Sequence, residues 1–370
     1  MIAFGPIPSR RLGRSLGVNN IPPKFCTYSC IYCQLGRTLQ MQVKREAFYA
    51  PEKIFQDVRE QADKSRAAGE RIDYLTFVPD GEPTLDVNLG REIALLRPLG
   101  LPIAVITNGS LLWRKDVRAD LRQADWVSVK VDAVQEQTWR RVNRPHGRLR
   151  LPTVLEGVLW FAAEFRGRLV TETMLVAGLN DGAAELEAVA EFLTRLRPST
   201  AYIAIPTRPP AGEWVRPPSE EAITRAYAIF REAVERVELL TGYEGDAFAF
   251  TGDAEQDLLS ITAVHPMREE ALVDFLNRAG ADWSLVQRLI AQGRLVKTEY
   301  EGQKFYKGKD SLKASSSQQV GLAIIRKQKR AGAKPGPAIG SAGWTNGPYS
   351  QEHVPASTHQ QSISQHPVGQ

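Results

Sequence analysis

Three cysteines lie close together in the chain, and their thiolates could bind a metal. Cys26, Cys30 and Cys33 are the only cysteines among the 370 residues, and their spacing is Cys-x3-Cys-x2-Cys. Thiolates are preferred ligands of zinc and of iron–sulfur clusters. An odd number of cysteines at this short spacing does not form a disulfide framework. A chain of this length without further cysteines is typical of an intracellular protein.

An iron–sulfur cluster fits this spacing better than zinc does. Structural zinc usually takes four protein ligands, often as two cysteine pairs that are separated by roughly a dozen or more residues. The sequence contains no second pair. A zinc site completed by His146 or by an acidic residue is one alternative, and three ordinary buried cysteines are another. A cluster of four iron atoms held by three cysteines would leave one iron open to a small molecule.

The first 250 residues alternate between short β-branched segments and segments with helical periodicity. The β-branched segments predict strands at 16–20, 74–78, 103–107, 126–131, 169–176 and 201–206. The helical periodicity predicts helices at 51–68, 87–97, 115–122, 154–165, 183–195 and 220–241. This alternation indicates an α/β fold with a parallel sheet and right-handed crossovers. Because six units are too few for an eight-strand barrel, we expect a partial (βα)6 barrel or an open sheet, with the chemistry at the carboxyl ends of the strands.

A second unit is predicted at 251–310, after a first domain at 1–250. It contains three helical segments and then two short strands around a hairpin-like turn, an order that resembles a winged helix. Winged helices often bind DNA through a basic helix and wing. Residues 255–307 contain seven basic and eight acidic side chains, however, and the expected recognition helix at 283–292 has only Arg288. We therefore do not expect DNA as a partner, and protein docking or covering of the barrel mouth fits this unit better.

The net charge of +5 is concentrated in the final segment of the chain. Residues 311–370 contain six basic residues and one acidic residue, whereas the first 310 residues contain 41 of each. The final segment is rich in Ser, Gln, Gly and Pro, so we predict a disordered basic tail. No segment approaches the roughly 18 apolar residues of a membrane span. The sequence therefore predicts a soluble, cytoplasmic protein with no membrane partner.

Further motifs around the cysteines carry a family resemblance. The segment GPIPSRRLGRSLGV begins at Gly5, IPPK begins at Ile21, and QLGRT begins at Gln34. Together with the cysteine spacing, these motifs resemble the radical S-adenosylmethionine (radical SAM) superfamily. More narrowly, they are similar to a microbial branch related to the wyosine-base (tRNA-imidazoG) synthases. The resemblance extends over about residues 4–250.

The resemblance implies an enzyme with two cofactors. Cys26, Cys30 and Cys33 would bind a 4Fe-4S cluster, and the open iron would chelate S-adenosylmethionine (SAM). Reductive cleavage of SAM would give a 5′-deoxyadenosyl radical that abstracts hydrogen from the substrate. The resemblance also implies an external electron donor of the flavodoxin or ferredoxin type.

A SAM pocket at the strand ends is implied as well. Tyr32 is similar to the aromatic residue that packs near the adenine, and the segment Asp80-Gly81-Glu82-Pro83-Thr84 is similar to the family's Gly-Gly-Glu motif for the SAM ammonium group, with Asp80 in place of the first glycine. The period of two in a strand places Ser128, Lys130 and Asp132 on one face, where they could bind the SAM carboxylate and ribose or the substrate. The cofactor-binding candidates are therefore Tyr32, Gly81, Glu82, Pro83, Thr107, Asn108, Ser128, Lys130, Asp132, Thr173 and Asn180.

Each of these motifs also has a purely structural interpretation. Gly-Glu-Pro and Asn-Gly are common turn sequences, and alternating polar residues can form a solvated strand face. Arg10, Arg11 and Arg14 could bind a phosphate or carboxylate of the substrate, or they could form surface salt bridges.

Because the chain has no further cysteines, fewer reaction classes of the superfamily remain possible. Relatives with a second cluster need additional cysteine ligands, so we predict a single-cluster enzyme. This weakens the hypothesis of a wyosine-like tRNA-base modification, although that reaction stays an alternative. A glycyl-radical activating enzyme and a non-enzymatic iron–sulfur regulator with a winged helix are further alternatives. The substrate is not identified by the sequence, and both protein and RNA are open.

Overall fold

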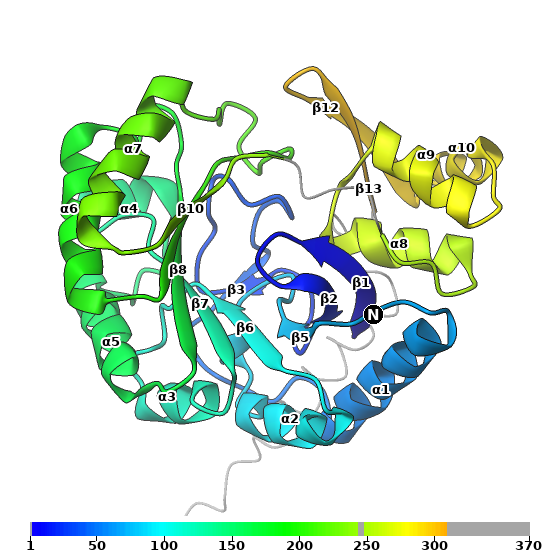
Figure 1. Cartoon of the computed structure of the whole chain (residues 1–370), viewed down its shortest axis with the longest axis horizontal. Helices are drawn as coiled ribbons and strands as arrows, with labels where there is room; N and C mark the ends of the chain where they lie inside the picture. The colour runs from blue at the N-terminus through cyan, green and yellow to red at the C-terminus, as the bar shows by residue number, and fades with distance from the viewer. Residues whose placement is uncertain (1, 243–247, 309–370) are drawn as a thin grey trace, which may run out of the picture. The chain divides into compact units, whose positions relative to one another are not determined.

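An eight-stranded sheet forms the framework of the computed structural model, which describes residues 2–242 and 248–308. Its strand order is β1-β2-β5-β6-β7-β8-β9-β10, in which β1 pairs antiparallel with β2 and all other neighbours are parallel. The strands are β1 (Ala3–Ser9), β2 (Gly13–Val18), β5 (Tyr74–Phe77), β6 (Ile103–Thr107), β7 (Trp126–Lys130), β8 (Arg168–Met174), β9 (Thr200–Ala204) and β10 (Val237–Leu240). Figure 1 shows that the sheet is curled and open, which confirms the predicted partial barrel.

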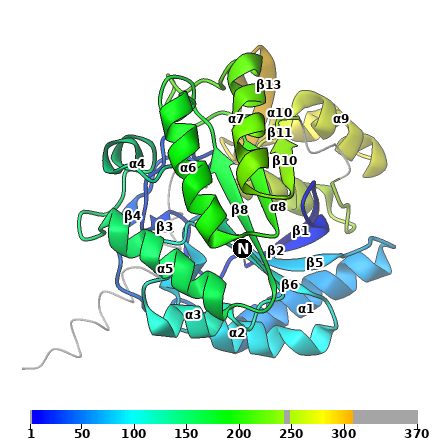
Figure 2. The same ribbon diagram turned by 60° about the vertical axis from the view of Figure 1, so that its left-hand side comes forward.

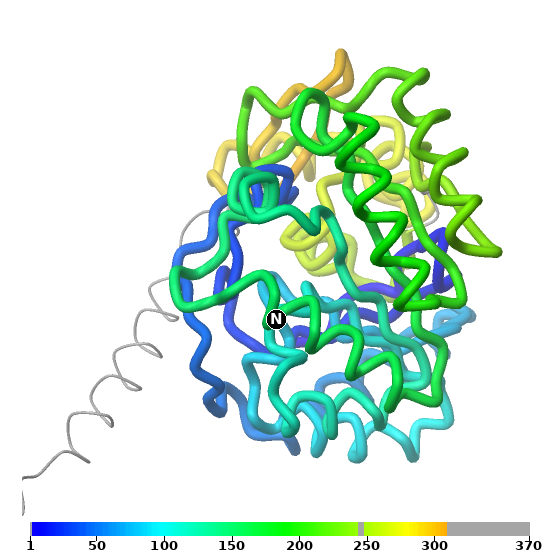
Figure 3. Tube along the Cα trace, turned by 90° about the vertical axis from the view of Figure 1, so that its left-hand side faces the viewer, coloured from blue at the N-terminus to red at the C-terminus, as the bar shows by residue number. Residues whose placement is uncertain are grey.

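The helices cover the outer face of this sheet (Figures 1 and 3). They are α1 (Pro51–Ala67), α2 (Leu89–Leu96), α3 (Lys115–Leu121), α5 (Leu151–Glu164), α6 (Ala183–Leu196) and α7 (Glu220–Ala233). The short helix α4 (Glu136–Val142) instead lies beside the cysteine segment, since the Ile31 N–H donates to the Val142 carbonyl at 3.0 Å. Two short 3-10 helices are present at Pro83–Leu85 and Arg97–Leu99. Figure 2 shows α6 and α7 side by side against β8 and β10. Because helices occupy one face and the other face encloses the barrel interior, strands such as β6 (IAVIT) are buried and rich in β-branched residues.

All six predicted strands are present, but the sheet extends by one strand at each edge. The predicted helix at 220–241 is wrong beyond Ala233, because the chain becomes extended at Val234 and then forms β10 beside β9. The short segment Val237–Leu240 has no strong signal of its own, and its pairing with β9 determines its conformation. The edge strand β1 was not predicted either, because it contains Pro6 and Pro8. Proline lacks a backbone N–H and is compatible with a strand only at an edge. The short helix α4 was also not predicted.

A C-terminal unit follows, which we define as residues 254–308. It consists of α8 (Ala254–Val264), β11 (Met267–Arg268), α9 (Glu269–Arg278), α10 (Trp283–Ala291), β12 (Leu295–Tyr300) and β13 (Gln303–Gly308). The predicted hairpin is present, since β12 and β13 pair antiparallel around Glu301 and Gly302, both of which have positive φ. The strand β11 adds a third strand in the order β11-β13-β12. The winged-helix-like assignment and the domain boundary near 250 stay predictions.

The predicted disordered tail at 311–370 lies outside the described residues. Within the described residues, no helix has both the length and the apolar composition that crossing a bilayer requires. Two short strands, β3 (Phe25–Cys26) and β4 (Gln40–Met41), pair in parallel. The chain between them contains Cys30 and Cys33.

Packing of α5 against the chain after β6 depends on a glycine, and this generates a first prediction. A Cβ atom at Gly157 would lie 2.2 Å from the backbone nitrogen of Trp113. Because that neighbour is backbone, we expect Gly157→Ala to lower the free energy of unfolding by about 1–3 kcal/mol, measured by urea denaturation. Gly147→Ala is the control, since a Cβ there meets open space. Equal stability of the two variants would contradict the packing of α5 described here.

Candidate functional site

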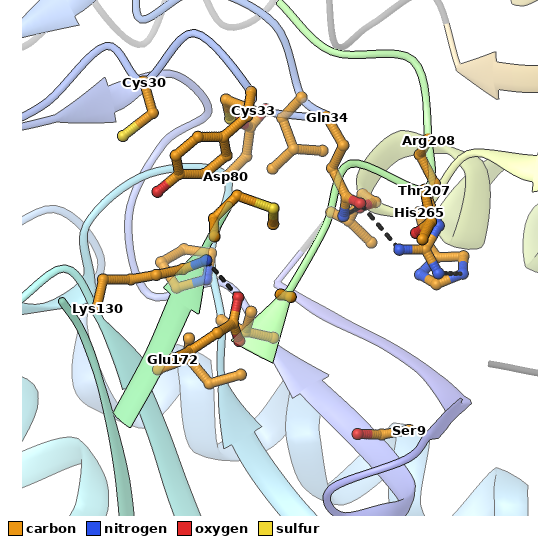
Figure 4. Close-up of a pocket in the computed structure, with 18 of the residues that line it drawn as sticks. Ser9, Cys30, Cys33, Gln34, Asp80, Lys130, Glu172, Thr207, Arg208 and His265 are labelled. Carbon is orange, nitrogen blue, oxygen red and sulfur yellow. Dashed lines mark hydrogen bonds and ion pairs between the residues drawn. The ribbon is translucent and has the colours of Figure 1, made fainter. Parts of the chain in front are cut away.

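The three cysteines lie on the segment that follows β2, beyond the carboxyl end of that strand. Cys26 closes β3, and a tight turn links the other two, because the backbone N–H of Cys33 donates to the Cys30 carbonyl at 3.2 Å. All three are partly buried and line one cavity of about 340 Å³ (Figure 4). The loop that carries them is therefore at the position where parallel α/β sheets place their chemistry.

Amide side chains from two other loops point at the cysteine sulfurs. The Nδ2 group of Asn108, after β6, lies 3.6 Å from Cys26 Sγ, and the Nδ2 group of Asn143, at the end of α4, lies 3.5 Å from Cys30 Sγ. Asn108 was predicted from the sequence, whereas Asn143 was missed because α4 was not predicted. Hydrogen bonds to cluster sulfurs are one of the means by which proteins adjust a cluster's reduction potential.

The thiols are in a strongly desolvated environment. Burial, together with the carboxylate of Glu82, raises the pKa of Cys26 well above its ordinary value. Burial and Asp132 raise the pKa of Cys30 to about 12, and burial raises the pKa of Cys33. Thiols in such a site release their protons when a metal centre binds them, because the metal supplies the missing positive charge.

The donor set of three thiols is compatible with a cluster. Within the described ranges 2–242 and 248–308, no group of three or more His, Cys, Asp and Glu side chains is arranged around one metal ion. The three thiols instead line a shared cavity, and each cysteine of a cluster binds a different iron atom. His146, the alternative zinc ligand, accepts a hydrogen bond from the Arg148 N–H at 3.1 Å through its Nδ1 atom and does not line the cavity.

A glycine after β5 lets a second loop approach the cysteine segment. Gly81 forms a β-bridge with Phe25, and a Cβ atom at Gly81 would lie 1.9 Å from the Phe25 carbonyl oxygen. The following N–H, of Glu82, donates to the same carbonyl at 3.0 Å. No side chain larger than hydrogen fits at this contact, which explains why the motif has glycine at position 81.

Asp80 replaces a glycine of the family motif, and its side chain pairs with Lys24. The Asp80 carboxylate lies 3.3 Å from Lys24 Nζ, and both residues line the cavity. Burial raises the pKa of Asp80 to about 6, although Lys24 opposes this shift. Asp80 and Gly81 therefore form the part of this turn that faces the cavity.

Glu82 is turned away from the cavity and uses its carboxylate within the protein. Its Oε1 atom accepts hydrogen bonds from the hydroxyl groups of Thr84 at 2.6 Å and Thr107 at 2.5 Å, and its Oε2 atom accepts one from the Asn108 N–H at 2.8 Å. Glu82 is 1% exposed and does not line the cavity. Pro83 belongs to the same turn, and its carbonyl accepts a hydrogen bond from Asn20. Glu82, Pro83 and Thr107 thus hold the turns after β5 and β6 together.

A charge triad, in which Glu172 is buried and Lys130 and Arg11 are partly buried, forms another part of the cavity wall. Lys130 and Arg11 each form an ion pair with one oxygen of Glu172 (Figure 4 shows the Lys130 pair). Arg11 also lies 5.9 Å from the ring centroids of both Trp126 and Tyr202. Burial would raise the pKa of Glu172, but the two cations lower it to about 2. Glu172 is therefore ionised, and its one negative charge stands against the two cations of the triad, of which Lys130 also interacts with the nearby Asp132 carboxylate.

Glu172 was missed by the sequence analysis, which selected the other face of β8. Its neighbour Thr173 instead donates to the Val131 carbonyl at 2.8 Å and does not reach the cavity. The available signal was an acidic residue inside a β-branched strand, because an ionised side chain in a buried strand requires a partner. Of the three arginines singled out in the sequence, Arg10 and Arg11 line the cavity, whereas Arg14 forms an ion pair with Glu70.

Tyr32 and Asp132 connect the cysteine loop to the end of β7. The Tyr32 hydroxyl donates to Asp132 Oδ2, which also accepts from Asn143 Nδ2 at 2.6 Å, while Oδ1 accepts from the Met174 N–H at 2.8 Å. Lys130 Nζ lies 5.1 Å from the centroid of the Tyr32 ring. Both carboxylate oxygens of Asp132 are thus bonded within the protein, and Tyr32 and Lys130 present their side chains to the cavity.

Two further predicted residues lie behind the cavity wall. Asn180 donates through Nδ2 to the carbonyl groups of Asp132 at 2.8 Å and Met174 at 2.9 Å, so it fixes the turn after β8. Ser128 lies two residues before Lys130 in β7, is 1% exposed and does not line the cavity. These residues support the site, whereas Tyr32, Gly81, Lys130 and the three cysteines line the cavity directly.

Comparison with known proteins places these residues in a family. Residues 20–193 match the model of the radical SAM superfamily. The UPF0026 protein MJ1312 of Methanocaldococcus jannaschii is 48% identical over 307 residues, which cover 82% of this chain and 95% of that protein. A UPF0026 protein of Helicobacter pylori is 33% identical over 211 residues, 56% of this chain and 67% of that protein. Among solved structures, TYW1 with a lysine-pyruvate adduct bound is 17% identical, with a TM-score of 0.45 over 60% of this chain and 74% of that one.

The hydrogen bonds of Glu82 generate a second prediction, made for the chain without cofactors. Glu82→Gln keeps the size of the side chain but replaces one acceptor oxygen by an NH2 group that faces protein donors. We expect the free energy of unfolding of the metal-free chain to fall by about 1–3 kcal/mol, measured by urea denaturation. If Glu82 acted only on a bound ligand, the metal-free variant would be as stable as the wild type.

Proposed function

Because the chain belongs to the radical SAM superfamily and is a UPF0026 protein, we propose that it is an enzyme with one 4Fe-4S cluster bound by Cys26, Cys30 and Cys33. When bound, the cluster and SAM supply a 5′-deoxyadenosyl radical, which abstracts a hydrogen atom from the substrate. The observation that carries this proposal is that the three thiols share one cavity with the excess positive charge of the Lys130–Glu172–Arg11 triad.

The residues around the cavity have distinct roles in this proposal. Asn108 and Asn143 donate hydrogen bonds to the cluster sulfurs, and Tyr32 packs beside the adenine. Lys130 binds the SAM carboxylate. Arg11 also pairs with Glu172, so the single negative charge of Glu172 does not neutralise both cations. The cavity face of Asp80 and Gly81 accepts hydrogen bonds from the SAM ammonium group. The roles of Glu82, Asp132, Thr173 and Asn180 are to hold these groups in position.

The remaining wall of the cavity faces the substrate. Ile7, Ile106 and Leu240 give it an apolar surface, which excludes water from the reacting atoms. A domain at 1–250 carries this machinery, and an external flavodoxin- or ferredoxin-type donor in the cytoplasm supplies the electron. We leave the substrate as an unidentified hydrogen donor that is part of a protein, an RNA or a small molecule.

The alternative of an iron–sulfur regulator that binds DNA has less support. In the C-terminal unit, Arg288 and Arg294 both form ion pairs with Glu255, and Lys304 forms one with Glu269. Basic side chains that are neutralised in this way contribute little to phosphate binding. A regulator would also have no need for a charge triad beside its cluster.

The cluster assignment is the third prediction. Anaerobic reconstitution of the wild-type chain should give four iron atoms per chain, and adding SAM should change the EPR spectrum of the dithionite-reduced cluster. With dithionite and SAM, 5′-deoxyadenosine should form. Cys30→Ala should lose the cluster absorbance while its circular dichroism stays like that of the wild type. A Cys30→Ala chain that retains the wild-type iron content would contradict the ligand assignment.

The role of Lys130 is the fourth prediction. Lys130→Gln removes the cation but leaves Arg11 to pair with Glu172, so the fold should be retained. We expect SAM affinity of the cluster-loaded chain to fall about tenfold, as for loss of a hydrogen bond to a charged group, measured by equilibrium dialysis. The exposed Lys44→Gln variant is the matched control and should bind SAM like the wild type. Unchanged SAM affinity in Lys130→Gln would contradict the proposal that Lys130 binds the SAM carboxylate.

A further inference from the structure

We propose that the C-terminal unit positions the loop after Cys33, through Gln34 and its hydrogen bonds to Val264 and to the Arg208–His265 pair. The inference rests on the proposed function in one respect, since it concerns the loop that carries the third cluster ligand. It assigns this unit a role inside the site rather than that of a separate binding module.

The contacts form a continuous chain from the C-terminal unit to the cysteine loop (Figure 4). Gln34 directly follows Cys33, and its Nε2 atom donates to the Val264 carbonyl at 3.3 Å. Its Oε1 atom accepts a hydrogen bond from Arg208 Nη1 at 3.1 Å, and Arg208 Nη2 lies 3.0 Å from His265 Nε2. The Gln34 amide therefore uses its donor and its acceptor on two elements that are distant from it in sequence.

The chemistry of this pair determines the state of His265. Arginine can only donate, so His265 Nε2 must accept the hydrogen bond and the ring proton must lie on Nδ1. Burial and the adjacent Arg208 hold the pKa of His265 well below its ordinary value, so the neutral ring persists. The imidazole is thus a fixed acceptor that orients the guanidinium, which in turn orients Gln34.

The third cysteine is anchored differently from the other two, since its sulfur is bonded by the Leu35 backbone N–H and not by a side chain of the barrel. Asn108 and Asn143 approach Cys26 Sγ and Cys30 Sγ from the barrel itself. The segment after Cys33 continues through Leu35 and Gly36, which also border the cavity. Gln34 connects this segment to α8 and to the chain after β9. The loop of three ligands is therefore held from three sides, and the C-terminal unit supplies one of them.

The unit is itself held firmly enough to serve as an anchor. His265 packs edge-on against Phe248 with ring centroids 5.2 Å apart, and Ile7 of β1 packs against the apolar core of the unit. A separate contact runs from the Tyr300 hydroxyl to the Pro206 carbonyl at 3.4 Å. That contact joins the same unit to the same segment after β9 without touching Gln34, so it offers a matched control.

Hydrogen–deuterium exchange of the metal-free chain tests the proposal independently of the cluster. In His265→Ala, the backbone amides at 33–37 should exchange about tenfold faster than in the wild type. Gln34→Ala should give the same local effect if His265→Ala fails to fold. His265→Gln, which offers Arg208 an amide oxygen, should return exchange toward the wild-type rate. Tyr300→Phe should leave these amides unchanged.

Iron release provides the second measurement. After reconstitution, a chelator should remove iron severalfold faster from His265→Ala than from Tyr300→Phe. Wild-type exchange at 33–37 in both His265→Ala and Gln34→Ala would overturn the inference, as would equal acceleration in Tyr300→Phe. If the wild-type chain forms no cluster, the proposed function fails, whereas the exchange measurement still decides this inference.

Discussion

The backbone contact between Phe25 and Gly81 is the constraint on which the site depends. It joins the loop after β2 to the loop after β5, directly before Cys26. The Glu82 N–H donates to the Phe25 carbonyl at 3.0 Å. From there Glu82 connects onward to Thr107 and Asn108, and Asn108 reaches Cys26. The loops after three neighbouring strands, β2, β5 and β6, thus fix the position of Cys26 Sγ. The parallel sheet is the reason that these ends meet at all.

Buried charge is arranged on two different principles around this site. Glu82 and Asp132 accept hydrogen bonds from neutral donors, and each has both oxygens bonded within the protein, although burial raises the pKa of Asp132 and the Lys130 charge opposes this shift. Glu172 is instead paired with two cations, so this side of the cavity has a net positive charge. The first arrangement makes the surrounding loops rigid, because a carboxylate with all its hydrogen bonds formed is held in one position. The second leaves one positive charge in excess within the triad, beside the cavity.

Most of the framework could be predicted from the sequence, because parallel buried strands such as β6 have a strong β-branched pattern. The cysteines, Tyr32 and Gly81, predicted from motifs, and Lys130, predicted from the period of two in a strand, line the cavity, while their roles stay predictions. The direction of a side chain was harder to predict. Glu82 belongs to the expected motif, yet its carboxylate turns inward to Thr84 and Thr107. Asn143 was missed because the short helix α4 was not predicted, and Glu172 was missed because the other face of β8 was selected, although an acidic residue inside a β-branched strand was a local signal.

Pro6 and Pro8, which hid β1 from the sequence analysis, also affect the association of this chain with other chains. An open sheet exposes unpaired N–H and C=O groups along its outermost strands, and such edges recruit strands from other chains into aggregates. Pro6 and Pro8 remove two donors from that edge, and the strand also has a bulge between Phe4 and Ile7. In the folded chain this edge is also covered, since the Ala249 N–H donates to the Pro6 carbonyl at 3.1 Å and Gln61 Nε2 donates to the Gly5 carbonyl at 2.7 Å. The irregular first strand is therefore a poor partner for a strand of another chain.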